Sequence, residues 1–398
     1  MSPPQFPDPI ASVSSTAGPD LILTNARVVT PDHVLPHGTV VVSQGRISAV
    51  DDAPTGVPGA LDLEGDYLLP GLVEMHTDHM EKHFMPRPGV LWPSPLAAVI
   101  AHDAQIAAAG ITTVFDAICC GQYSDGSMRR QMLADQIAAV KHAVTSRLLR
   151  VDHLLHLRCE VSDACVVEIF EPYRTDPLVR LVSLMDHTPG QRQWNDLSKL
   201  RQFDSDKNMS DAEFDSMIAE RVADQQRYAH AHRRQVLEMV AQRDDIVLAT
   251  HDDTTEAHVD EALAEGATIS EFPTTVTAAA RAHGAGMKTI MGAPNVVRGG
   301  SHSGNVSALD LAQGGILDGL SSDYVPASLL QAAFHVSETL EIPLPPAVAL
   351  VSANVADMVG LPDRGRIAPG KKADLVRVRR IDGVPLPAEV WRDGRRVC

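Results

Sequence analysis

The chain has 398 residues, of which 44% are hydrophobic and 21% are charged, a composition typical of a globular protein. Its 34 Lys and Arg residues against 51 Asp and Glu residues give a net charge of −17, which excludes a nucleic-acid or anionic-membrane binder because phosphates would be repelled over the whole surface. No apolar run reaches the ~18 residues of a membrane span, no signal sequence is present, and the five cysteines form no Cys-x-x-Cys pair, so we expect a cytoplasmic protein with reduced thiols.

The two ends of the chain carry short strands. Residues 1–19 are rich in Pro, Ser and Ala without periodicity and are predicted to be a disordered tail. In residues 20–70, alternating apolar residues such as those of GTVVVSQGRISAV are separated by Gly and Pro, which predicts the first part of a small β domain. Residues 361–398 return to this pattern in KKADLVRVRR and AEVWRDGRRV. We expect both ends to combine in one β-sandwich domain.

Buried strands and helices alternate between these ends, over residues 71–360. Helical stretches separate most of the strands, and Ser210 with Glu213 three residues later is a capping box that begins the longest stretch. This alternation predicts an α/β fold, a (β/α)8 TIM-like barrel with the small β domain attached. The eight predicted strands are residues 72–76, 112–117, 153–160, 179–187, 245–251, 267–272, 288–293 and 318–323.

Acidic residues and histidines stand at the ends of five of these strands. His76 and Asp78 end the first, and their i, i+2 spacing points both to one face of a strand. The carboxyl ends of barrel strands meet at one mouth, so we expect these two residues to lie with four other candidate ligands. A single strand-end histidine is more often a hydrogen-bonded structural residue, but six such side chains predict two divalent metal ions, Zn²⁺ first and Mn²⁺ or Fe²⁺ as alternatives. The other four candidates are Glu160, His187, His251 and Asp323.

The segment GAPNVVRGGSHSGN, residues 292–305, is predicted to bind an anion. Its glycines let the backbone approach a ligand, and its hydroxyl, amide and guanidinium groups donate hydrogen bonds. Many Gly-rich segments are only flexible turns, and this one lacks the GK[ST] ending of a Walker loop. Lys82, Arg87 and Arg192 follow the first and fourth strands and are expected to add positive charge. The candidate substrate-binding residues within the segment are Asn295, Arg298, Gly299, Ser301, His302, Ser303 and Asn305.

These segments together resemble the amidohydrolase superfamily. LLPGLVEMHTD and GRIAPGKKADLV are similar to the segments that bracket the barrel in that superfamily. MDHTPGQRQ and RGGSHSGN narrow the resemblance to its members in the carbon–phosphorus lyase pathway of phosphonate degradation, and the likeness runs from residue 20 to the C-terminus. The resemblance implies a metal-dependent hydrolase that cleaves a phosphorylated ribose, a ribose 5-triphosphate, to the 5-phosphate and pyrophosphate. It also implies Asp323 as the catalytic acid and base.

The chain departs from the superfamily's usual pattern at several positions. His-x-Asp replaces the commoner His-x-His, as in the phosphonate-pathway members, and His79 stands where those members usually have Asn. His187 and His251 fall on the fourth and fifth predicted strands, one earlier than the commonest pattern. Glu271, on the sixth, is either a further metal ligand or a residue that orients one.

Two other functions stay open. An enzyme of the same fold that hydrolyses a cyclic amide or deaminates an amine needs the metals but no phosphate-binding segment. A non-catalytic subunit of a phosphonate-processing complex needs neither the ligands nor Asp323. The sequence also leaves open whether the chain forms a homo-oligomer.

Overall fold

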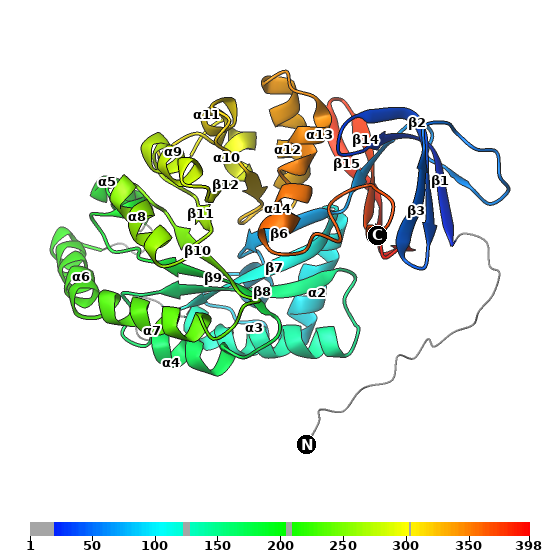
Figure 1. Cartoon of the computed structure of the whole chain (residues 1–398). Helices are drawn as coiled ribbons and strands as arrows, with labels where there is room; N and C mark the ends of the chain where they lie inside the picture. The colour runs from blue at the N-terminus through cyan, green and yellow to red at the C-terminus, as the bar shows by residue number, and fades with distance from the viewer. Residues whose placement is uncertain (1–19, 122–127, 204–208, 302–303) are drawn as a thin grey trace.

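A computed structural model of the chain describes residues 20–121, 128–203, 209–301 and 304–398. The predicted disordered tail, residues 1–19, lies outside the described residues. Eight parallel strands follow one another in a single sheet, with helices around its outside, and a second sheet stands to one side (Figure 1). The (β/α)8-like barrel and the separate sheet from both chain ends are therefore confirmed.

All eight predicted barrel strands are present in the predicted order. The fourth ends at Met185, so the prediction that it reaches His187 was wrong, and His187 lies in the segment that follows. The strands are β6 (Leu72–Thr77), β7 (Ile111–Cys120), β8 (Asp152–Glu160), β9 (Val179–Met185), β10 (Val247–His251), β11 (Ile269–Glu271), β12 (Lys288–Gly292) and β13 (Gly319–Ser321).

Helices connect each barrel strand to the next. The predicted capping box is present at Ser210 and begins a helical stretch that continues to Val240 through one π-helical turn. None of the helices in the described ranges combines the length and apolar composition needed to cross a membrane. The helices are α1 (Glu81–Phe84), α2 (Pro95–Ala108), α3 (Met128–Thr145), α4 (Val166–Phe170), η1 (Glu171–Tyr173), η2 (Arg192–Trp194), α5 (Leu197–Phe203), α6 (Asp211–Asp224), η4 (Gln225–Ala229), α7 (His230–Val240), α8 (Glu256–Ala264), α9 (Val276–Gly284), α10 (Ala293–Arg298), α11 (Ala308–Gln313), α12 (Ser328–Thr339), α13 (Leu344–Ala349) and α14 (Ala353–Met358).

The floor of the barrel is apolar. Val73, Phe115, Leu181 and Ile290 come from four different strands and pack with α14, which covers this end. Side chains two residues further along a strand point to the same face, so His251 and Glu271, which follow Ala249 and Ile269 of this floor, also face the interior. The polar layer of the barrel therefore lies above an apolar floor, at the carboxyl ends of the strands.

The first and last strands meet through few hydrogen bonds, which a buried carboxylate completes. Thr77 and Asp323 form a single parallel bridge, and Asp323 N donates to His76 O at 3.1 Å. Glu74 accepts from His76 N at 2.6 Å and from Ser322 N at 2.5 Å. Burial raises the pKa of Glu74 to about 7. The closure of the barrel thus fixes the backbone at the positions of His76 and Asp323.

The second sheet joins both chain ends in the order β16-β15-β14-β5-β1-β2-β3, with β4 beside β1. The sheet curls, and Ile47 N of β3 donates to the carbonyl of Lys371, just before β14, at 2.9 Å. The sheet encloses a hydrophobic core of its own. Asp152, the first residue of β8, accepts hydrogen bonds at 2.8 Å from Arg364 and Lys372 and ties this sheet to the barrel. The strands are β1 (Leu21–Val29), β2 (Val34–Ser43), β3 (Arg46–Asp51), β4 (Leu61–Asp62), β5 (Tyr67–Pro70), β14 (Leu375–Ile381), β15 (Val384–Arg392) and β16 (Arg395–Arg396).

A chain of buried charges links β7, β8 and α2. Asp116 accepts from His102 Nε2 and from His153 Nδ1, both at 2.8 Å, and His153 Nε2 lies 3.5 Å from Asp103. Asp103 also pairs with Arg150 at 2.9 Å. Burial alone would lower the pKa of His153, but Asp116 and Asp103 raise it to about 9. His153 is therefore a buried cation between two carboxylates.

The stability of the fold should depend on the proton of His153. Its pKa is about 9 in the folded chain and near 6.5 when unfolded, so its contribution is complete below pH 6.5 and is lost as the pH rises through 9. At about 1.4 kcal/mol per pKa unit, the loss is on the order of 3 kcal/mol. Urea unfolding between pH 6 and 9.5 should show this fall in the native chain and in His142→Gln, a variant at an exposed position of α3. An equal fall in His153→Gln would contradict the assignment.

Candidate metal centre and substrate pocket

A pocket lies at the carboxyl ends of the barrel strands, directly above the polar layer. Four of the six predicted metal ligands and four of the predicted substrate-binding residues line it together. From the first group these are His76, His187, His251 and Asp323, and from the second they are Asn295, Arg298, Ser301 and Asn305. His302 and Ser303 lie outside the described residues.

Glu271 holds two of these histidines. It stands opposite His251 in the pairing of β10 and β11, and its carboxylate accepts from His76 Nδ1 at 3.1 Å and from His251 Nδ1 at 3.3 Å. Burial would raise the pKa of Glu271, but the imidazoles of His156 and His76 hold it well below its usual value. An ionised carboxylate only accepts hydrogen bonds, so both rings carry a proton on Nδ1 and keep Nε2 for another partner. This arrangement is typical of a residue that orients metal ligands.

Glu160 holds the third histidine in the same way. Its Oε2 accepts from His187 Nδ1 at 2.6 Å, while Oε1 accepts from Ser162 at 2.8 Å and from His187 N at 3.1 Å. With so many hydrogen bonds, Glu160 is placed to orient His187. We had predicted Glu160 as a direct ligand, and the geometry favours the orienting role.

Asp252, which the sequence analysis did not single out, faces the free side of two rings. Its Oδ2 lies 3.4 Å from His187 Nε2 and 3.5 Å from His251 Nε2. This oxygen is buried and has no hydrogen-bond partner in the described part of the chain. The ligand atoms of the three residues all lie within 4.8 Å of one another. Two imidazoles and a carboxylate are a donor set that suits Zn²⁺ and similar divalent ions.

The electrostatics of this group also suit a cation. Burial would lower the pKa of His187, but Glu160 and Asp252 raise it to about 9, so these carboxylates favour a positive charge here. Burial lowers the pKa of His76 to about 4, which keeps its imidazole neutral, as a metal ligand must be. The residues present therefore fit a divalent metal ion.

Asp323 lines the pocket, whereas Asp78 is not among the lining residues and acts on Asp323 through its charge. Burial of Asp323, and next the charge of the half-buried Asp78, raise the pKa of Asp323 to about 7. Asp323 has a positive φ of 53° and bonds through its backbone to Thr77, so its position follows from the closure of the barrel. A carboxyl group with a pKa near neutrality takes up and releases protons readily at pH 7.

Arg158 is a second residue that the sequence analysis missed. It lines the pocket, and it shares one face of β8 with His156 and Glu160 because the three are spaced at i, i+2 and i+4. His156 lies below it, with Nε2 2.9 Å from Ser183 Oγ and 3.9 Å from the carboxylate of Glu271. The i, i+2 alternation that the sequence analysis applied to His76 and Asp78 was, applied to β8, the signal for Arg158.

The predicted anion-binding segment borders the pocket at the end of α10. Gly299 ends this helix in the left-handed conformation, with φ 77°, which turns the chain after Arg298. Asn295 donates to Val306 O at 3.1 Å and accepts from Ala308 N at 3.0 Å, so its amide holds the segment in place. Arg298 is exposed, and its Nη1 lies 3.5 Å from the hydroxyl of Tyr324.

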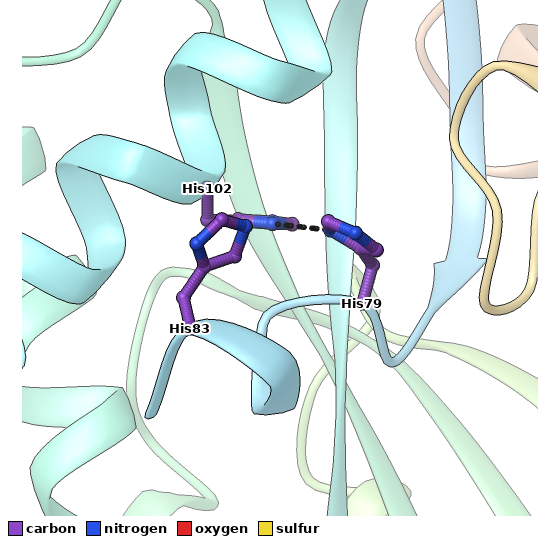
Figure 2. A group of neighbouring side chains, drawn as sticks. All are labelled: His79, His83 and His102. Carbon is purple, nitrogen blue, oxygen red and sulfur yellow. Dashed lines mark hydrogen bonds between the residues drawn. The ribbon is translucent and has the colours of Figure 1, made fainter. Parts of the chain in front are cut away.

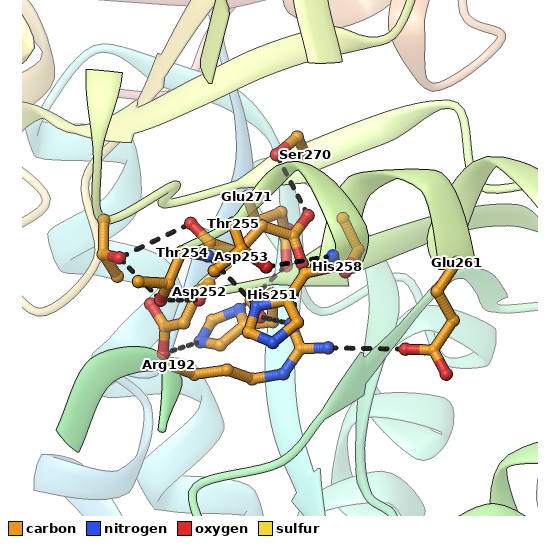
Figure 3. A network of polar contacts seen from close by, with 12 residues as sticks. Arg192, His251, Asp252, Asp253, Thr254, Thr255, His258, Glu261, Ser270 and Glu271 are labelled. Atoms are coloured by element: carbon orange, nitrogen blue, oxygen red, sulfur yellow. Dashed lines mark hydrogen bonds and ion pairs between the residues drawn. The ribbon is translucent and has the colours of Figure 1, made fainter. Parts of the chain in front are cut away.

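Three predicted substrate-binding cations lie outside the residues that line the pocket. Lys82 donates to Tyr324 O at 2.8 Å, and Arg87 is an exposed residue bridged to Val90. Arg192 is buried and donates to Asp253 at 2.7 Å and to His251 O at 2.9 Å (Figure 3). Arg192 therefore secures the turn after β10 that carries the candidate metal ligands His251 and Asp252.

Comparison with known proteins gives results that agree with this geometry. Residues 67–397 match the model of the amidohydrolase family. The chain is 44% identical over 380 residues, covering 95% of it and the whole of the relative, to the α-D-ribose 1-methylphosphonate 5-triphosphate diphosphatase of Escherichia coli (strain K12).

Solved structures of lower identity share the fold. An N-acetyl-D-glucosamine-6-phosphate deacetylase from Mycobacterium smegmatis matches with a TM-score of 0.61 and 17% identity, over 95% of this chain and 100% of that one. A 5-methylcytosine deaminase from Klebsiella pneumoniae matches with a TM-score of 0.63 and 13% identity, over 95% and 97%.

Asp252→Asn should lose metal. An amide would replace the carboxylate that lies beside the two rings, so we expect the affinity for Zn²⁺ to fall by at least ~10- to 100-fold, the cost of disturbing such a site. Elemental analysis after dialysis against buffered Zn²⁺ measures this directly. The matched control is Asp260→Asn on the outer helix α8, which should keep its metal. Equal metal content in the two variants would exclude Asp252 as a ligand.

Proposed function

The chain belongs to the amidohydrolase family, and on that premise we propose that it hydrolyses α-D-ribose 1-methylphosphonate 5-triphosphate, or a closely related ribose 5-triphosphate, to the 5-phosphate and pyrophosphate. The observation that carries the proposal is the 44% identity, over the whole length of the relative, to the diphosphatase that acts on this compound by name. A pocket that combines candidate metal ligands with two arginines supports it independently.

Two divalent ions, Zn²⁺ first, would be held by two groups of side chains. His187, His251 and Asp252 would hold one ion, and His76 with the carboxylates of Asp78 and Asp323 would hold the other. Bound metal ions lower the pKa of water and stabilise charge on phosphoryl oxygens. Glu271 and Glu160 would keep the imidazole rings in the orientation that binding needs.

Arg158 and Arg298 would bind the triphosphate. The net charge of −17 repels a polyanion at long range, so cations local to the pocket must hold it. The guanidinium groups of these two arginines line the pocket and offer paired donors that match phosphate oxygens. A neutral cyclic amide would leave both unpaired, which disfavours amide hydrolysis and deamination as the activity.

Asp323 would move the proton. Asp323 lines the pocket, where its carboxylate would accept a proton from the attacking water while the anhydride between the first and second phosphoryl groups is cleaved. The protonated carboxyl group then donates to the pyrophosphate oxygen that leaves. The sugar keeps one phosphate.

Product analysis tests the proposed reaction. Purified protein supplied with Zn²⁺ and a ribose 5-triphosphate should release pyrophosphate and the 5-phosphate in equal amounts, and phosphorus NMR separates these signals from orthophosphate. A mixture without the protein is the control. Sequential release of orthophosphate, or turnover of a cyclic amide with none of the triphosphate, would contradict the proposal.

Arg298→Ala should reduce activity toward charged substrates. A charge-assisted hydrogen bond contributes roughly 1.5–3 kcal/mol, so kcat/KM for the triphosphate should fall by about one to two decades. The fall should be smaller for an uncharged ester, which has no phosphate to leave unpaired. Arg281→Ala, on the outer helix α9, is the matched control and should retain full activity. Equal losses on charged and neutral substrates would remove Arg298 from phosphate binding.

A further inference from the structure

A second cluster of imidazoles lies outside the pocket. His79 follows β6, His83 lies on α1 and His102 lies on α2, and the three rings face one another (Figure 2). One ring nitrogen of each lies within 4.8 Å of the other two. The residues that line the pocket include none of the three.

His102 is oriented by a carboxylate. Its Nε2 donates to Asp116 Oδ1 at 2.8 Å, and the other oxygen of Asp116 accepts from His153. Both oxygens of Asp116 are therefore occupied, and Nδ1 of His102 presents its lone pair to the cluster. This is the hydrogen bond that a metal-binding histidine typically makes with its second nitrogen. Asp116 orients a ligand here and is not one itself.

His83 contributes a nitrogen that lacks a partner. Its Nε2 is buried and makes no hydrogen bond within the described residues. A buried polar atom without a partner is costly, typically by about 1–3 kcal/mol. The ring that carries this atom lies beside the two other imidazoles, so a cation bound among the three would meet a nitrogen from each.

The distances suit a transition metal ion. Ligand nitrogens around a tetrahedral Zn²⁺ lie about 3.3 Å apart, as follows from Zn–N bonds of about 2.0–2.1 Å. A hydrogen bond joins Nδ1 of His79 and Nδ1 of His102, which are 3.5 Å apart (Figure 2). The ring of His83 lies with its centroid 5.1 Å from that of His79 and 5.9 Å from that of His102.

We propose that His79, His83 and His102 form a binding site for a divalent transition metal ion, Zn²⁺ in the first place, separate from the catalytic centre. Three imidazoles with a fourth position for water make such a site. The site would tie the segment after β6 to α2 and so fix the turn that carries Asp78. The inference does not depend on the proposed activity.

Metal stoichiometry tests this site. Full-length chain freed of metal with a chelator is dialysed against Zn²⁺, and bound metal is measured by elemental analysis. His79→Asn and His83→Gln should each bind one equivalent fewer than the native chain, while His142→Gln, exposed on α3, should bind the native amount. Two cluster variants are used so that a folding defect in one does not decide the outcome, and circular dichroism checks both.

Two further measurements separate this site from the catalytic centre. In an Asp252→Asn background, the cluster should still bind Zn²⁺, and adding His83→Gln should remove that equivalent. Co²⁺ in the same background should give a visible absorption band that His79→Asn weakens by the share of one bound ion. Native stoichiometry in folded His79→Asn and His83→Gln would overturn the proposal.

Discussion

The site depends on the hydrogen bonds that the buried, ionised carboxylate of Glu271 accepts from two imidazoles. The register of β10 and β11 sets Glu271 beside His251, and the closure of the barrel brings His76 to its other oxygen. Because Glu271 accepts from both Nδ1 atoms, both Nε2 atoms are left to bind something else. Glu160 repeats the arrangement at His187. The barrel thus orients the histidines that are the candidate ligands.

Three of the non-glycine residues with left-handed backbone lie at these same strand ends. Asp252, Phe272 and Asp323, which follow β10, β11 and β13, have φ of 56°, 53° and 53°. Each left-handed residue costs on the order of 1–3 kcal/mol, and for Phe272 the conformation is rare. At Asp252 the left-handed conformation interrupts the alternation of β10. Asp252 therefore reaches the same pocket as the adjacent His251. The packed barrel provides the stability that this geometry costs.

The fold was largely predictable from the sequence, and the site was predictable in part. Parallel strands buried on both faces read as apolar runs, which is why all eight were found. Asp252 was missed because a left-handed turn, invisible to alternation, aims it at the pocket. Arg192 resembled a free cation because its partner Asp253 lies 61 residues away. Arg158 was missed because only Glu160, the last residue of its strand, was considered as a residue of the barrel mouth.

Charge and orientation together account for the site, and the orientation can be observed directly. Diffraction from zinc-loaded crystals, recorded on both sides of the zinc absorption edge, locates the ions among their ligands. We predict that an anomalous peak marks a zinc ion bonded to Nε2 of His187, Nε2 of His251 and the carboxylate of Asp252. Glu271 should still accept a hydrogen bond from Nδ1 of His251. A zinc ion coordinated by Glu271 and Glu160, with the Asp252 side chain turned away from it, would contradict this account.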